Sequence, residues 1–87
     1  MAEIDRDRVI DEIVRQITLH LGRLEAREEQ VARYRQVVQY PERHGGINLG
    51  VEREKTAASI AALRALAKDL GLKEEVDSKI DIPPDMV

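Results

Sequence analysis

The stretch LAKDLGLKEEVDSKI, residues 66–80, decides how this chain folds. Leucines and alanines recur at helical spacing up to Leu70, and Gly71 then interrupts the pattern. A glycine directly after the last periodic residue is typical of a helix C-terminus, because glycine adopts the left-handed conformation at little cost. Leu72 is placed to fold back on Ala67, as in a Schellman motif. The stretch therefore predicts the end of one helix and a short helical or turn segment over residues 73–80.

The residues before this stretch predict two helices that form a hairpin. From Asp5, a suitable N-cap, to about residue 40 the chain has no proline and one glycine, Gly22. Pro41 ends this first helix, and residues 41–50 form a loop by composition. The second helix is expected over about residues 51–70, with an apolar stripe at Ile60, Leu63, Leu66 with Ala67, and Leu70. The predicted fold is all-α: one domain over residues 1–80, a long antiparallel helical hairpin, with an extended tail over 81–87.

Composition limits the function classes. Of 87 residues, 36% are charged and 2% are aromatic, which is typical of long helices and coiled coils. A core from such a chain is thin, and packing against another copy is the usual remedy. The net charge of −3 argues against strong, purely electrostatic nucleic-acid binding, although a local basic stripe stays possible. The absence of cysteine fits a cytoplasmic protein, and the charged start MAEIDRDRVI predicts neither a signal peptide nor a membrane span.

The first helix carries apolar residues in alternating steps of four and three, interrupted at Glu28 and Arg35. We expect the ordinary helical period to shift the buried side and to bring Arg27 and Tyr34 onto it. The first helix has about 36 residues and a length of about 54 Å, against about 30 Å for the second. A hairpin would then cover only the second half of the first helix. The exposed first half predicts a homo-oligomer interface made of Val9, Ile10, Ile13, Val14, Ile17 and Leu21. The alternative is a first helix that bends near Gly22 and folds back into a three-helix monomer.

Candidate sites for chemistry are few. His20 lies at the edge of the apolar stripe and His44 in the loop, where packed and exposed histidines respectively are the ordinary interpretation. No histidine pair has metal-ligand spacing, and neither serine (Ser59, Ser78) stands beside a candidate base. An acidic run on the first helix, taken as a solvated face, comprises Glu25, Glu28 and Glu29. We expect no metal, no cofactor and no enzymatic activity.

Two further groups of residues are candidates for binding partners. Arginines on the first helix are candidates for weak or non-specific contacts with double-stranded DNA, and we single out Arg15, Arg23 and Arg27. The tail IDIPPDMV has two prolines that favour an extended path and apolar residues around them. Such a tail suits docking into a partner's groove through Ile82, Pro83, Pro84, Met86 and Val87. The alternative is a frayed terminus.

Two segments together resemble the small terminase subunits of tailed bacteriophages and related gene-transfer particles. LEAREEQVARYRQVVQYPERHG, residues 24–45, resembles that family's helix with an A-R-Y/W-R patch before a loop. AALRALAKDLGLKEEVDSKI, residues 61–80, resembles its L-G-L ending, with Lys73-Glu74 where the family has Thr-Pro. The resemblance implies a ring-forming helical protein that presents viral DNA to the large terminase subunit in the bacterial host cytoplasm. The tail would then contact the large subunit or another protein of the packaging machinery.

Two other hypotheses belong to different classes. IDEIVRQI and VARYR, within residues 10–35, resemble the first helix of the all-helical chorismate mutases, and ALRALAKDLGL resembles their second. Leu24 stands where those enzymes need a mid-helix arginine, and Pro83-Pro84 falls where their third helix continues. The remaining hypothesis, a dimeric helical adaptor or regulator, needs no resemblance.

Overall fold

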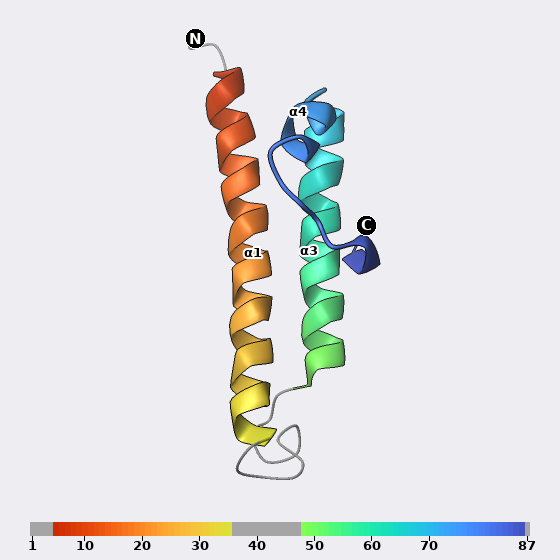
Figure 1. The fold of residues 1–87 in the computed structure, drawn as a ribbon. Helices are drawn as coiled ribbons and strands as arrows, with labels where there is room; N and C mark the ends of the chain where they lie inside the picture. Colours follow the sequence, from red (N-terminus) through yellow and green to blue (C-terminus); the bar gives the residue numbers. More distant parts are fainter. Residues whose placement is uncertain (1–4, 36–47, 87) are drawn as a thin grey trace.

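The computed structural model of the chain describes residues 5–35 and 48–86 (Figure 1). Its elements are α1 (Arg6–Arg35), α3 (Leu49–Asp69), the short α4 (Lys73–Asp77) and a 3-10 helix η1 (Pro84–Met86). α1 and α3 pack antiparallel, α4 packs against both of them near the start of α1, and the chain then returns along the hairpin to η1 (Figure 1). The predicted all-α hairpin is confirmed. The predicted last turn of the first helix, residues 41–47 of the predicted loop and His44 lie outside the described residues, whereas residues 49 and 50, predicted as loop, belong to α3.

The ends of the helices are set by local hydrogen bonds. The Asp5 carboxylate accepts from the backbone N–H groups of Asp7 (3.1 Å) and Arg8 (3.3 Å), so Asp5 caps α1 as expected. The Asn48 side chain accepts from the N–H of Val51 at 3.2 Å and caps α3. These side chains satisfy backbone donors that have no partner within a helix.

The C-terminus of α3 is the predicted Schellman motif. The N–H of Leu72 donates to the carbonyl of Ala67 at 2.7 Å, and that of Gly71 donates to Lys68 at 3.0 Å. Gly71 has a φ of +72°, a conformation that disfavours residues with a Cβ. Leu72 and Ala67 are both buried in the core, so the predicted turn directs the chain back onto the hairpin.

The buried side of α1 keeps a seven-residue spacing. Ile10, Ile17, Leu24 and Val31 are all buried, and this regular repeat is the pattern of helices packed as in a coiled coil. The expected shift of the buried side is therefore wrong for Arg27, which is exposed. The side chain of Tyr34 lies outside the described residues. On α3 the buried side runs through Thr56, Ile60 and Ala67, whereas Leu66 and Leu70, predicted to be buried, are 48% and 45% exposed.

The first half of α1 is covered within one chain. α1 has 30 residues and α3 has 21, so α1 does extend beyond its partner helix. α4 fills this space, and its Val76 joins Ile10, Ile13 and Ile17 in one buried cluster, while Val9, Val14 and Leu21 are partly buried against it. The expectation that no later segment covers this stripe is wrong, because Gly71 turns the chain back. α1 is also continuous through Gly22, so no bend occurs there.

Ion pairs hold α4 in place. Glu75 pairs with Arg6, and Lys79 lies 3.2 Å from Asp11, which joins the segment to α1. The guanidinium of Arg64 on α3 donates two hydrogen bonds to the Asp77 carboxylate, at 3.1 and 3.2 Å. The pKa of Glu75 is lowered, first by a hydrogen bond to its own backbone N–H and then by Arg6.

The C-terminal segment packs on its own chain and does not extend away from it. Met86 is only 7% exposed and belongs to the core cluster, and Ile82 is partly buried against that cluster. Residues 84–86 form η1, so the predicted extended path is wrong for this part. An apolar side chain near the end of a chain gains more by covering the hairpin than by remaining in water. Val87 lies outside the described residues.

A candidate binding groove between α1 and the C-terminal segment

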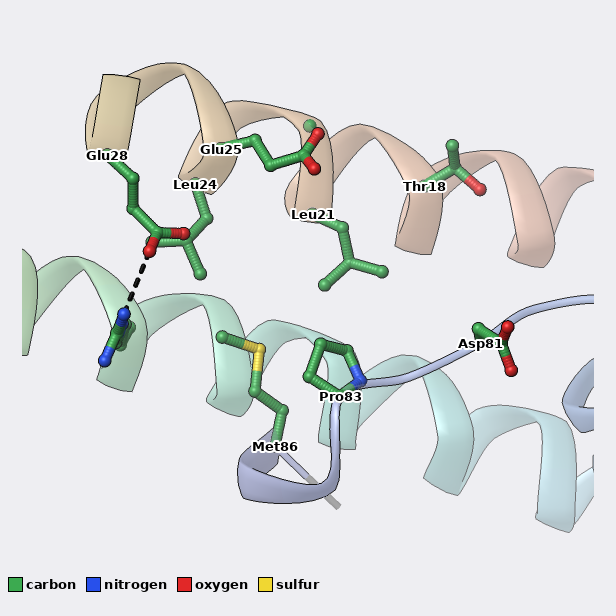
Figure 2. Close-up of a pocket in the computed structure, with 10 residues that line it drawn as sticks. Thr18, Leu21, Leu24, Glu25, Glu28, Asp81, Pro83 and Met86 are labelled. Atoms are coloured by element: carbon green, nitrogen blue, oxygen red, sulfur yellow. Dashed lines mark hydrogen bonds and ion pairs between the residues drawn. The ribbon is translucent and has the colours of Figure 1, made fainter. Parts of the chain in front are cut away.

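A groove forms where the C-terminal segment crosses the hairpin (Figure 2). Its volume is about 480 Å³, and it is lined by α1, by one residue of α3 and by the returning chain. Leu21 and Leu24 of α1 point toward Pro83 and Met86 of the C-terminal segment (Figure 2). These four side chains make the apolar floor of the groove.

Carboxylates dominate the rim of the groove. Glu25 and Glu28 come from α1 and Asp81 from the C-terminal segment, and the single basic residue is Arg53 of α3. The Arg53 guanidinium lies 2.9 Å from a Glu28 carboxylate oxygen, drawn as a dashed line in Figure 2. Glu25 and Asp81 form no ion pair with any described residue, and both are exposed. The groove therefore carries two acidic groups that no described residue neutralises.

Gly22 forms part of the groove wall. A Cβ built at this position would meet no atom within 4 Å, so packing within the chain does not require a glycine here. Glycine in the interior of a helix is less stable than alanine by about 0.5–1 kcal/mol. A bare backbone at this wall leaves room for a bound group to approach α1 closely.

The predicted site residues are distributed as follows. Pro83 and Met86, predicted as anchors for a partner, line the groove together with Glu25 and Glu28 of the predicted acidic run. Asp81 and Arg53 were not predicted, because only the return of the chain brings their two segments to one groove. The six residues of the predicted oligomer interface all lie in the core or pack against it. One of them, Leu21, also lines the groove.

The three predicted arginines are not gathered in one place. Arg15 forms an ion pair with Glu12, with Nη2 2.6 Å from Oε1, and Arg27 donates to the Gln30 side chain at 3.3 Å. Arg23 lines a shallow pocket of about 210 Å³ between α1 and α3. That pocket also contains His20, Lys55 and the opposing charge of Glu52.

The Glu12–Arg15 pair shifts both groups toward their charged forms. Hydrogen bonds from Arg15 and then from Gln16 lower the pKa of Glu12 from 4.5 to about 2. The hydrogen bond to Glu12 raises the pKa of Arg15. An arginine engaged in this way has to break an existing contact before it can bind a phosphate.

Within residues 5–35 and 48–86, no helix combines the length and the apolar character that crossing a membrane requires. No three histidine or acidic side chains in the same ranges come together as a set that could hold a metal ion. Comparison of the chain with protein-family models, curated proteins and solved structures found no match.

Proposed function

We propose that this chain is a helical adaptor or regulator that binds a basic, partly apolar segment of another protein in the groove. The observation that carries the proposal is the combination of an apolar floor with two carboxylates, Glu25 of α1 and Asp81 of the C-terminal segment, that line the groove and form no ion pair with any described residue. An apolar side chain of the bound segment would contact Leu21, Leu24 and Met86. A neighbouring lysine or arginine would pair with the carboxylates, which supplies specificity and a faster association rate.

A direct test uses a fluorescein-labelled synthetic peptide in which leucine and lysine recur at helical spacing. We expect saturable binding by fluorescence anisotropy that weakens as salt rises, because exposed charges are screened. The double change Glu25→Gln and Asp81→Asn removes both rim charges and should weaken binding about tenfold. A matched control, Glu29→Gln with Glu54→Gln, removes two exposed carboxylates that do not line the groove and should leave the affinity within twofold.

A second variant tests the groove without changing charge. Gly22→Leu places an apolar side chain on the groove wall, where space is open, and should block the peptide while the helical circular dichroism signal stays unchanged. Equal weakening by the two double variants, or undiminished binding to Gly22→Leu, would contradict the proposal.

A small terminase function is the second candidate, favoured by the shallow pocket that Arg23, His20 and Lys55 line together with Glu52. There the backbone phosphates of DNA would contact α1 and α3. The sequence resemblance over residues 61–80 is the other support, since the L-G-L segment forms the turn between α3 and α4. This candidate predicts that a 30-base-pair duplex shifts in an electrophoretic mobility assay and that Arg23→Ala with Lys55→Ala removes the shift. The adaptor proposal predicts no shift.

A further inference from the structure

α3 and its C-cap residue, Leu70, carry an apolar ridge on the exposed side of the helix. Every fourth residue contributes to it, and we define the ridge as Ala58, Ala62, Leu66 and Leu70. All four residues are exposed, Leu66 by 48% and Leu70 by 45%. Rows of side chains four residues apart are the ridges by which one helix packs against another. The ridge is therefore a helix-packing surface that the chain leaves open.

The C-terminal part of the chain does not cover this ridge. Arg64, which binds Asp77 after α3 has ended, lies two residues from both Ala62 and Leu66. Two residues correspond to about 200° around a helix, so Arg64 is on the opposite side of α3. α4 and the C-terminal segment therefore pack away from the ridge, and an additional helix has access to it.

We propose that the central part of the ridge, Ala58, Ala62 and Leu66, binds the same three residues of a second copy of this chain, with a two-fold axis at Ala62. In such an antiparallel arrangement the two copies of the helix run in opposite directions. A residue that lies n positions before Ala62 in one copy therefore faces the residue n positions after Ala62 in the other copy. The interface is then isologous, and it closes at two copies. Ala62 lies on the axis, where a small side chain lets the two backbones approach closely.

The sequence on either side of Ala62 is complementary to itself in size. Ala58 and Leu66 lie four residues before and after the axis, so Ala58 faces Leu66 of the partner subunit twice in the dimer. A large side chain against a small one allows two helix surfaces to interdigitate. Two leucines facing each other at these positions would hold the helices apart.

The same register is complementary in charge. Lys55 and Asp69 lie seven residues before and after Ala62, so each lysine faces Asp69 of the partner subunit. Neither side chain forms an ion pair or hydrogen bond with any described residue of its own chain. Asp69 is also the last residue of α3, where the helix dipole disfavours a carboxylate. A lysine from the second copy would neutralise a carboxylate that no described residue of its own chain pairs with.

The first experiment measures mass in solution by light scattering after size exclusion, on the full chain at about 0.5 mM. We expect twice the chain mass of 9.9 kDa. Ala62→Glu should give the monomer mass, and the adjacent Ala61→Glu, also exposed but off the ridge, should leave the dimer intact. A wild-type monomer, a mass above two chains, or equal dissociation by both variants would overturn the proposal.

The second experiment tests the register by exchanging charges. Lys55→Asp and Asp69→Lys each create two like-charge contacts across the axis, and each should raise the dimer dissociation constant about tenfold. The double exchange restores two opposite-charge contacts and should return the constant to within threefold of the wild-type value. Failure of the double exchange to restore dimerisation would rule out this register. Because no ridge residue lines the groove, peptide binding and dimerisation can succeed or fail separately.

Discussion

At the scale of single residues, Gly71 shows how one backbone conformation directs the rest of the chain. Its φ of +72° costs an alanine about 1–2 kcal/mol, although a Cβ would meet no atom within 4 Å. Gly71→Ala is therefore expected to lower the free energy of unfolding by about 1–2 kcal/mol in urea denaturation. The control Gly22→Ala lies inside a regular helix in open space and should raise it by about 0.5–1 kcal/mol. Changes of the same sign in both variants would contradict this explanation.

The contacts of a second single residue, Glu12, lead us to expect that the stability of the chain depends on pH. Its pKa is about 2 in the folded chain and 4.5 without its partners, chiefly because Arg15 donates hydrogen bonds to it. The stabilisation is therefore fully present above pH 4.5 and is lost as the pH falls toward 2. We expect the difference in melting temperature between wild type and Glu12→Gln to shrink over this window. Because the pair is exposed, added salt should reduce the difference at pH 6. A constant difference between pH 6 and pH 2 would exclude this role for Glu12.

At the scale of elements, two neighbouring positions on α1 distinguish its buried side from its exposed side. Ile17 is fully buried and Leu19, two residues later, is 42% exposed. Ile17→Ala should cost about 2–5 kcal/mol of unfolding free energy, because it removes core contacts and leaves a cavity. Leu19→Ala should change it by less than about 0.5 kcal/mol. If the first half of α1 were instead an open oligomer surface, Ile17→Ala would lower the mass in solution and leave the unfolding free energy of the single chain nearly unchanged. That outcome would contradict the prediction.

The elements also show where sequence patterns are sufficient and where they are not. Helical spacing predicts the apolar stripe on α1 but not the segment that covers it, because α4 reaches the stripe only through the turn at Gly71. Leu66 of α3 and its C-cap residue Leu70 are large apolar residues of the kind that fill cores, yet both are exposed at the surface. Helical spacing identifies a line of apolar residues, whereas burial depends on which neighbour faces that line.

At the scale of the whole molecule, which measures 56 × 21 × 20 Å, the C-terminal segment joins the hairpin to the groove. Met86→Ala should lower the free energy of unfolding by at most about 2 kcal/mol, the low end for a buried methionine, because a terminal segment can detach locally. Hydrogen exchange should then speed up at residues 81–86 and stay slow in the middle of α1. Uniformly faster exchange in both regions would mean that the segment and the hairpin unfold as one unit.

The sequence predicts some residues of the groove but not the groove itself. The sequence pattern predicts Glu25 and Glu28 as part of an acidic run and Pro83 and Met86 as docking residues of the tail, but nothing in it brings the two segments together. Asp81 and Arg53 had no signal of their own, since a lone charged residue in a chain this rich in charge is unremarkable. Contacts between residues so distant in the sequence depend on the path of the chain after α4.

The sequence alone determined the two long helices, the start of the first and the end of the second. Asp5, Asn48 and Gly71 act through hydrogen bonds and backbone conformations within a few residues, and such local effects can be read from neighbouring letters. Only the tertiary structure decided that α4 and Met86 complete the core, that Leu66 and Leu70 stay exposed, and that a groove with an acidic rim forms. The physical reason is that burial is a property of two surfaces, and the second surface here lies far along the chain.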